Sequence, residues 1–315
     1  MLKKLLEALL FALISLSASA WEPHGEIYLI VAYKAGTATD IGARLLAKHA
    51  EKYVGTKINV VNIPGADGKE GWFNLANATP NGQTIGYINL PTFTTFTVMR
   101  DAPFELSDIV PIVNHVSEVS VIVVRADSQY STIDDLLTAL SSDNTIRAST
   151  NGYTASNHTA AELFVQSANL EYKPLHCDGT ADQILALRNG TVDFTCAKLS
   201  DIISLATNYN SELRILAVFS ETRDPSIPDI PTLAEKNLYP HWYGSSRAIA
   251  APKGTPDEVI QFYEEAFGKT LTDPECVREH DKLELNIDYM DSQELTNFIK
   301  AQEKFAKKIV SGLYK

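Results

Sequence analysis

The fold is decided by one stretch near the N-terminus, Ile27-Tyr28-Leu29-Ile30-Val31-Ala32-Tyr33-Lys34-Ala35-Gly36-Thr37-Ala38-Thr39-Asp40-Ile41. Its apolar first part predicts a buried strand, and the apolar spacing from Ile41 onward predicts a helix that ends near Gly55. The small-residue loop 34–39 therefore lies between the carboxyl end of a strand and the amino end of a helix. Backbone N–H groups there lack intrahelical partners, and the helix dipole favours an anion. We therefore expect this loop to bind an anionic ligand.

Two similar transitions follow along the chain. A predicted strand at 58–61 leads into Pro64-Gly65-Ala66-Asp67-Gly68, and a predicted strand at 84–88 leads into Asn89. Strands and helices thus alternate in βαβαβ order, which is typical of a parallel sheet with right-handed crossovers. Ligands of such sheets bind at the carboxyl ends of the strands.

The same design recurs in a second unit. After an apolar strand at 119–125 and a strand at 145–149, a polar loop ends in Thr154-Ala155-Ser156-Asn157, and further strands are predicted at 172–175, 192–196 and 213–218. An extended piece at 247–251 returns to the first unit, whose surface is covered by the C-terminal helices. We predict an α/β fold with two hinged domains and two mixed or parallel sheets. Domain I comprises 21–121 and 247–315, and domain II comprises 122–246.

Residues 1–20 have the pattern of a secretory signal. Lys3 and Lys4 precede an apolar run at 5–16, and Ala18-Ser19-Ala20 is a small-x-small cleavage site. The alternative, a membrane-spanning or amphipathic first helix, is disfavoured because about 12 apolar residues are too few to cross a bilayer. We expect cleavage after Ala20, which leaves about 295 residues as a soluble, exported protein.

Charge and cysteine content narrow the function further. The formal net charge of the 315 residues is −12, which disfavours nucleic acids and anionic membranes as partners. An anionic ligand therefore needs a local site. Cys177, Cys196 and Cys276 match no metal or redox motif. Cys177 and Cys196 each end a short apolar run. Either the two runs are neighbouring strands and the cysteines form a disulfide, or both remain buried free thiols.

The loops offer binding groups rather than catalytic ones. The sequence contains no nucleophile elbow, no zinc motif and no phosphate-binding loop. Backbone N–H groups, hydroxyls and amides can hold a carboxylate. We expect no cofactor and no bound metal, and the rival interpretation is a hydrolase or transferase that uses His158 or Asp40. Lys34 either pairs with the ligand or is solvated, and Arg247 either clamps the ligand or forms a salt bridge beside the hinge.

Together these motifs resemble the periplasmic solute receptors of tripartite tricarboxylate transporters, the TctC or Bug type. The resemblance rests on the order of several short motifs, which are Lys34-Ala35-Gly36-Thr37-Ala38-Thr39-Asp40-Ile41-Gly42-Ala43-Arg44, Asn62-Ile63-Pro64-Gly65-Ala66-Asp67-Gly68, Pro80-Asn81-Gly82-Gln83-Thr84, Gly190-Thr191-Val192-Asp193, Pro228-Asp229-Ile230-Pro231-Thr232 and Ala251-Pro252-Lys253-Gly254-Thr255-Pro256. Lys34 and Thr37 replace the family's Pro and Gly. The similarity extends from about Tyr28 to the C-terminus.

The resemblance implies a two-domain periplasmic binding protein, a type II-like Venus flytrap, with a carboxylate in a hinged cleft. It implies ligand contacts at Lys34, Gly36, Thr37, Ala38, Thr39, Pro64, Gly65, Ala66, Asp67, Gly68, Thr154, Ala155, Ser156, Asn157, Asp178, Ala197 and Lys198. From the strand-end loops and the hinge we also expect contacts at Tyr33, Asp40, Asn89 and Arg247. Ala197 stands where many relatives have Asp, which disfavours an amino-acid ligand. Lys34 and Arg247 favour a di- or tricarboxylate.

These observations predict a non-enzymatic receptor in the periplasm. We expect a monomer that delivers its carboxylate to the membrane permease subunits of a tripartite tricarboxylate transporter. A binding protein that reports its ligand to a membrane signalling partner would have the same sequence features, so transport and sensing both remain open.

Overall fold

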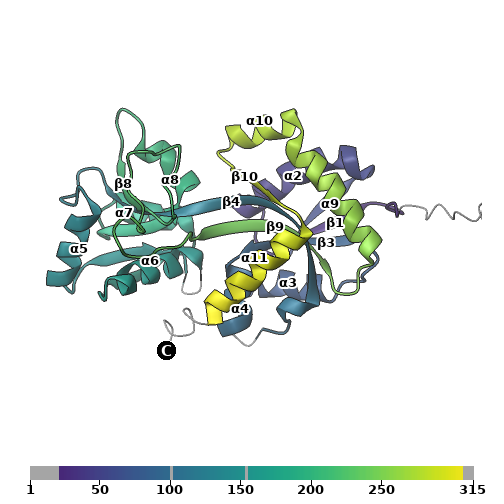
Figure 1. Cartoon of the computed structure of the whole chain (residues 1–315), viewed down its shortest axis with the longest axis horizontal. Helices are drawn as coiled ribbons and strands as arrows, with labels where there is room; N and C mark the ends of the chain where they lie inside the picture. The colour runs from purple at the N-terminus through teal and green to yellow at the C-terminus, as the bar shows by residue number, and fades with distance from the viewer. Residues whose placement is uncertain (1–20, 100–101, 153–154, 308–315) are drawn as a thin grey trace, which may run out of the picture.

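The computed structural model describes residues 21–99, 102–152 and 155–307, which form two α/β lobes joined by two long strands (Figure 1). Lobe I begins with the predicted βαβαβ unit. Its elements are β1 (Ile27–Val31), α2 (Ala38–Val54), β2 (Ile58–Asn62), the 3-10 turn η1 (Ala66–Gly68), α3 (Lys69–Ala76), β3 (Thr84–Leu90) and α4 (Thr92–Met99). β1 lies between β2 and β3, and all three are parallel. Four of the five β1 residues are buried, as expected for a strand covered on both faces.

The two lobes share a pair of antiparallel strands, β4 (Ile109–Arg125) and β9 (Gly244–Pro252). In the sequence, β4 comes directly after the 3-10 turn η2 (Leu106–Asp108), and β9 comes after the last strand of the second lobe. β4 starts ten residues before the predicted strand. The sequence obscured this part because Asn114, His115 and Glu118 interrupt its apolar pattern, yet all three are buried. The predicted boundaries between domains I and II, at 121/122 and 246/247, fall inside these continuous strands. The division into domains at these positions stays a prediction.

Lobe II is built on the second half of β4. Its elements are α5 (Ile133–Ser142), β5 (Arg147–Thr150), α6 (Ser156–Ser167), β6 (Lys173–His176), α7 (Thr180–Arg188), β7 (Phe194–Lys198), α8 (Leu199–Ala206) and β8 (Leu213–Val218). β7 and β8 both pair with β4 in antiparallel fashion, whereas β5 runs parallel to β7 and β6 runs parallel to β5. The predicted mixed sheet is therefore present.

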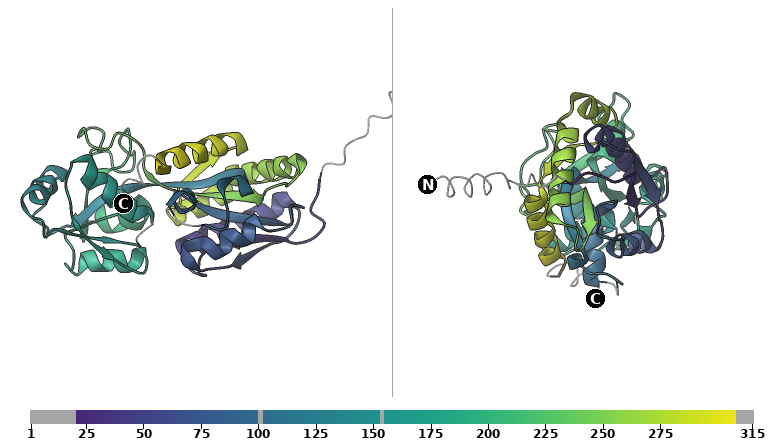
Figure 2. Two further views of the ribbon diagram at one scale, coloured as in Figure 1. Left: turned by 90° about the horizontal axis from the view of Figure 1, so that it is seen from below. Right: turned by 90° about the vertical axis from the view of Figure 1, so that its right-hand side faces the viewer.

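The C-terminal part returns to lobe I, as predicted. It consists of α9 (Asp257–Thr272), α10 (Pro274–Lys282), β10 (Ile287–Met290) and α11 (Ser292–Phe305). α9 packs beside α2, and α11 lies across β4 and α4 (Figure 2). β10 adds to the sheet by pairing with β4.

Each lobe has its own hydrophobic core. The lobe I sheet is covered on both faces, with Tyr263 and Phe267 in one cluster and Trp72 and Phe93 in the other. The core of lobe II is one large cluster that contains Phe194. Separate cores allow the lobes to move relative to each other without repacking.

The structure shows whether Cys177 and Cys196 form a disulfide, which the sequence left open. Cys177, Cys196 and Cys276 all carry free thiols, so the disulfide alternative is excluded. Cys196 is completely buried in the core of lobe II, and this burial raises the pKa of its thiol.

Candidate ligand-binding site

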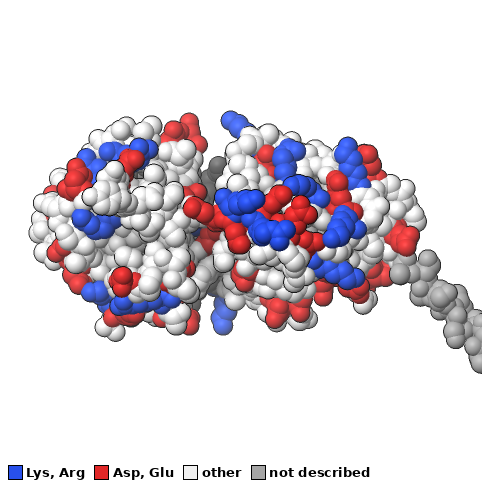
Figure 3. Space-filling model, turned by 90° about the horizontal axis from the view of Figure 1, so that it is seen from above, with Lys and Arg blue, Asp and Glu red and all other residues white. Residues whose placement is uncertain are grey.

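Strand register places the loops of both lobes on opposite sides of the hinge. In lobe I, Leu90 at the end of β3 lies opposite Ser246, near the start of β9. In lobe II, Lys198 at the end of β7 lies opposite Ser120, where β4 enters the lobe. The neighbouring strands β1, β2, β5 and β6 run in the same directions as β3 and β7 respectively. Their carboxyl-terminal loops therefore face one another across the groove that separates the lobes (Figure 3).

The first loop is shaped by the N-cap of α2. The hydroxyl of Thr37 accepts a hydrogen bond from the N–H of Asp40 at 3.4 Å and donates to the carbonyl of Lys34 at 2.9 Å. In return, the carboxylate of Asp40 accepts from the N–H of Gly36 at 2.8 Å. These reciprocal bonds fold loop 34–37 back onto the helix.

Asp40 is the anchor of this loop. Its carboxylate also accepts from Arg44 Nε at 3.0 Å and from Asn62 Nδ2 at 2.8 Å. Burial alone would raise the pKa of Asp40, but the hydrogen bonds from Arg44, Gly36 and Asn62 outweigh it and lower the pKa. A carboxylate held from three sides stabilises the loop and is a poor general base, which weakens the rival interpretation of Asp40 as a catalytic residue.

The first turn of α2 leaves backbone donors at the groove. Ala38 and Thr39 occupy the first two helical positions, whose N–H groups have no acceptor within the helix. The hydroxyl of Thr39 accepts from Asn89 Nδ2 at 2.9 Å, which ties the end of β3 to this turn. Lys34 is exposed, and Tyr33 is half-buried with its ring edge-on to Trp72.

The second loop has a backbone that only small residues permit. Gly65 and Gly68 have φ of +150° and +102°, and Ala66 has a left-handed φ of +44°. A Cβ on Gly68 would lie 2.7 Å from the ring of Trp72. Pro64 is exposed together with Gly65 and Ala66, whereas the side chain of Asp67 lies outside the described part of the structure.

The predicted contacts of lobe II fall into different environments. Ala155 caps α6 and Ser156 is half-buried, while Thr154 lies outside the described residues. Asp178 is exposed after β6, and Ala197 is completely buried in β7. Asn157 and Lys198 are buried and hydrogen-bonded to each other, with 2.5 Å between Asn157 Oδ1 and Lys198 Nζ.

Arg247 lies in the hinge. Its Nη2 atom is 2.7 Å from Glu118 Oε2, and both side chains are at least nine-tenths buried. The other carboxylate oxygen of Glu118 accepts from the hydroxyl of Ser200 on α8. The salt bridge expected as one alternative for Arg247 is thus present, and a ligand contact of Arg247 stays a prediction. Its Nε and Nη1 atoms are buried and have no hydrogen-bond partner in the described part of the chain.

His158 is part of the interior of lobe II. It is 2% exposed, its Nδ1 lies 3.2 Å from the hydroxyl of Tyr172, and its ring packs edge-on against His176. Burial lowers the pKa of His158 to about 4, and the neighbouring His176 adds to this effect. The structure thus gives His158 a buried, neutral role. Among the described residues, no group of three or more His, Cys, Asp or Glu side chains is arranged to hold a metal ion.

Several residues with central positions were not identified from the sequence. Gln183 on α7 is completely buried and hydrogen-bonded to Asn157, but nothing in the pattern of its short helix distinguishes it. Glu118 had a detectable signal, because an acid next to a purely apolar strand requires a buried partner. Asn62 donates to both Asp40 and the carbonyl of Tyr33, and thereby connects two loops.

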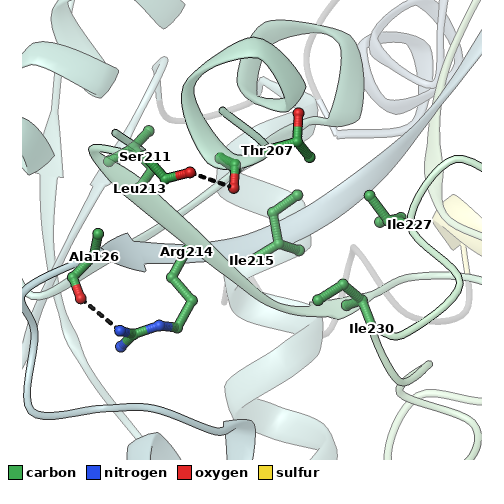
Figure 4. A pocket seen from close by; sticks show the side chains of 9 residues that line it. Ala126, Thr207, Ser211, Leu213, Arg214, Ile215, Ile227 and Ile230 are labelled. Carbon is green, nitrogen blue, oxygen red and sulfur yellow. Dashed lines mark hydrogen bonds between the residues drawn. The ribbon is translucent and has the colours of Figure 1, made fainter. Parts of the chain in front are cut away.

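A surface cavity of about 240 Å³ lies elsewhere, beside β8 in lobe II (Figure 4). Its walls are mainly Leu213, Ile215, Ile227 and Ile230. The guanidinium of Arg214 donates to backbone carbonyls, including that of Ala126 at 2.6 Å. This cavity is at the outer end of β4, away from the loops that meet at the hinge.

Two α/β lobes, two connecting strands and facing strand-end loops define a hinged solute-binding protein. The model of the TctC family, the tripartite tricarboxylate transporter family receptors, matches residues 42–313. The chain therefore belongs to the TctC family.

Individual relatives agree with this assignment. A protein of Cupriavidus necator named for the gbd 5′ region is 26% identical over 92% of this chain and 88% of its own length. The crystal structure of a TctC solute-binding protein from Polaromonas, without ligand, has a TM-score of 0.79 at 26% identity and covers 92% of this chain and 99% of its own. MatC from Rhodopseudomonas palustris with bound malate shares the fold, with a TM-score of 0.79 at 19% identity over 91% of this chain and 99% of its own. Among the described residues, no helix combines the length and apolar character needed to span a bilayer.

Proposed function

We propose that this chain is a periplasmic receptor that captures a small organic di- or tricarboxylate between its lobes. It then delivers the ligand to the permease subunits of a tripartite tricarboxylate transporter. Residues 1–20 lie outside the described part, and their pattern supports export with cleavage after Ala20. The receptor acts as a monomer, and closure of the lobes over the ligand creates the surface that the permease recognises.

The observation that carries this proposal is the amino end of α2. Asp40, Thr37 and Asn89 hold the loop and the first helical turn in place. The N–H groups of Ala38 and Thr39 remain directed out of the helix end, where a carboxylate binds favourably. Lys34 adds a positive charge to the same loop, which matters because the protein as a whole is acidic.

Two further points support a carboxylate ligand. A protein of the same fold binds malate, a dicarboxylate. The acidic side chain of the first loop, Asp40, is neutralised by its own partners and so does not repel an anion. The loops that face the groove from lobe II, at 155–157 and 177–179, select the rest of the ligand.

A thermal-shift screen with mono-, di- and tricarboxylates, aromatic acids and amino acids tests the proposal. A ligand at 100 times its Kd adds about 2.7 kcal/mol to the free energy of unfolding, so a true ligand shifts the Tm clearly. We expect dicarboxylates or tricarboxylates to give the largest shifts. A screen in which only amino acids raise the Tm would refute the proposal, and turnover of a bound carboxylate would favour an enzyme instead.

Ala38→Pro tests the role of the helix end directly. Proline is favoured at the first helical position, and the extended ψ of 159° at Thr37 is compatible with a following proline, so the helix should persist. The substitution removes one N–H donor. We expect the ligand-free Tm to be unchanged or slightly raised, and the Kd for the carboxylate to rise about tenfold, as for one lost charge-assisted hydrogen bond. Equal affinity of the two proteins would place the carboxylate elsewhere.

A further inference from the structure

Lys198 is a buried cation without a carboxylate partner. It is the last residue of β7, it is 4% exposed, and its ammonium group donates to Asn157 Oδ1 at 2.5 Å and to Ser120 Oγ at 3.2 Å. Both acceptors are neutral, and none of the carboxylates in the described part of the chain forms an ion pair with Lys198. Arg247, the other buried cation at the hinge, differs because it is paired with Glu118.

An unpaired buried charge is costly, so its retention calls for an explanation. An ammonium group has three N–H donors, and the two neutral acceptors use two of them. Lys198 lies at the carboxyl end of β7, which is the end that faces the groove. Its third donor and its charge are therefore suited to a negative group that arrives between the lobes.

Gln183 fixes the orientation of this ammonium group. Its Nε2 donates to the carbonyl of Cys196 at 2.6 Å and to the hydroxyl of Thr195 at 2.5 Å, so its Oε1 must be the acceptor that faces Asn157 Nδ2 at 3.0 Å. Asn157 therefore presents Oδ1, and not its amide N–H group, to Lys198. The hydrogen bonds through the two amides can therefore run in one direction only. Asn157 donates to Gln183 and accepts from the ammonium of Lys198.

The charges around Lys198 do not neutralise it individually. Asp201 on α8 and Glu118 on β4 act on it from a distance, and Arg247 on β9 opposes them. With Lys198 included, these four groups contain two positive and two negative charges. Glu118 is already paired with Arg247, and Asp201 balances Lys198 only from a distance, so a ligand anion would be the first negative group in direct contact with the ammonium.

We propose that Lys198 receives a second carboxylate of the ligand and thereby selects dicarboxylates over monocarboxylates, with Gln183 as the residue that positions it through Asn157. This inference rests on the proposed function, because the first carboxylate binds at α2. Gln183 itself does not touch the ligand.

Isothermal titration with matched acids tests the selection. Succinate is compared with butyrate, and adipate with hexanoate, in the wild type, Lys198→Met and Gln183→Met. We expect the wild type to bind each dicarboxylate at least tenfold more tightly than its partner. Lys198→Met should abolish this ratio while the Kd for the monocarboxylate is unchanged, and Gln183→Met should reduce it. Lys173→Met and Gln166→Met, at exposed positions of lobe II, are the matched controls and should keep the ratio.

The pH dependence separates a role in binding from a purely structural role. Burial lowers the pKa of Lys198 to about 8, while Asp201 and Glu118 raise it, Arg247 lowers it and Cys196 raises it slightly. A bound anion favours the charged form. Dicarboxylate affinity should therefore be constant between about pH 7 and 8, where Asp201 and the ligand carboxylates are ionised, and fall up to about tenfold per pH unit above it, whereas monocarboxylate affinity should not. Lys198→Met should remove this fall.

The ligand-free Tm gives an independent readout. Because the ammonium is buried without a direct counter-ion, Lys198→Met should leave the Tm unchanged or raise it. A large drop in Tm together with equal losses for mono- and dicarboxylates would make Lys198 structural and overturn the inference. Equal binding of both acid classes by the wild type would overturn the inference but not the proposed function, whereas binding of no carboxylate would overturn both.

Discussion

Glu118 and Arg247 lie on the two antiparallel strands that connect the lobes, and their side chains form a buried ion pair with 2.7 Å between Oε2 and Nη2. The pair is not confined to the hinge, because Ser200 of lobe II donates to the free oxygen of Glu118. A buried pair contributes little net stability, but the loss of one partner leaves an uncompensated charge.

Glu118→Ala should therefore lower the free energy of unfolding by about 3–5 kcal/mol, the cost of a broken buried ion pair. Urea denaturation of Glu118→Ala, of the single variants Glu118→Leu and Arg247→Met, and of the double variant Glu118→Leu/Arg247→Met measures this loss. The double variant should recover most of the loss. Glu235→Gln, which breaks the exposed pair with Arg223, is the control and should change little. Additive losses in the double variant would contradict direct coupling.

Asp40→Asn should weaken both the loop and ligand binding. The amide cannot accept from Gly36, Arg44 and Asn62 as the carboxylate does, and we expect a loss of about 1.5–3 kcal/mol in stability. Carboxylate affinity should fall as well, because loop 34–37 loses its anchor.

Asp135→Asn is the matched control for this effect. Asp135 closes a similar capping box with Thr132 on α5 of lobe II. This variant should also be less stable, yet it should bind the ligand normally. If both variants bind equally well, the shape of loop 34–37 is not needed for affinity.

Folding lowers the pKa of Asp40, so the contribution of Asp40 to stability is present above the unfolded pKa of about 3.9 and is lost as the pH falls below that value.

Acid should also destabilise the protein through a buried pair of histidines in lobe I. His280 Nδ1 lies 2.7 Å from the carbonyl of Cys276 and must carry a proton, so its Nε2 accepts from His115 Nε2 at 2.6 Å. His115 Nδ1 then accepts from the hydroxyl of Tyr87 at 2.5 Å. Both rings are neutral in this arrangement.

Burial lowers the pKa of both histidines, so the unfolded chain binds protons first as the pH drops. Their contribution to the free energy of unfolding is complete above about pH 6.5. Below that pH, each histidine lowers the free energy of unfolding by up to about 1.4 kcal/mol per pH unit. Urea denaturation between pH 5 and 8 measures this slope. We expect His115→Leu/His280→Leu to flatten it, with His24→Leu at an exposed position as the control for loss of an imidazole. An unchanged slope in the double variant would assign the acid sensitivity to other groups.

The glycines of the two candidate ligand loops of lobe I should respond differently to substitution by alanine. Gly36 has φ of +84°, but the space that a methyl group would occupy is open, so Gly36→Ala should cost only about 1–2 kcal/mol for the left-handed backbone. Gly68→Ala adds a clash with Trp72, whose ring atoms would lie within 2.9 Å of the new methyl group. Its cost should be about 1–3 kcal/mol larger. Thermal and urea denaturation of both variants give the comparison.

Most of the fold could be predicted from the sequence because local patterns carry it. The apolar run at 27–31 and the glycine-rich turns after it specify the parallel unit of lobe I, and these strands occur as predicted. The start of β4 could not be predicted, because His115 and Glu118 are buried by partners that lie far away in the chain. His280, for example, is 165 residues from His115.

The candidate site could be predicted only in part for the same reason. Which loops meet follows from strand order, and their backbone donors follow from the start of α2. Whether a side chain is free or occupied depends on tertiary neighbours. The sequence left open whether Arg247 clamps the ligand or forms a salt bridge, and only the structure pairs it with Glu118. Asp40 is likewise paired with Arg44, and a ligand contact of either residue stays a prediction. Gln183 gave no sign of its position behind Asn157.

The register of β4 and β9 has a consequence for how the chain is assembled. Val119 and Gly244 are direct neighbours on these strands, so the chain leaves lobe I and returns to it at the same point. Lobe I is built from two chain segments, one before and one after lobe II, and its β4–β9 hairpin has lobe II in place of a tight turn. Lobe II is thus an insertion, and its loops can change in sequence without interrupting the sheet that carries the proposed carboxylate loops.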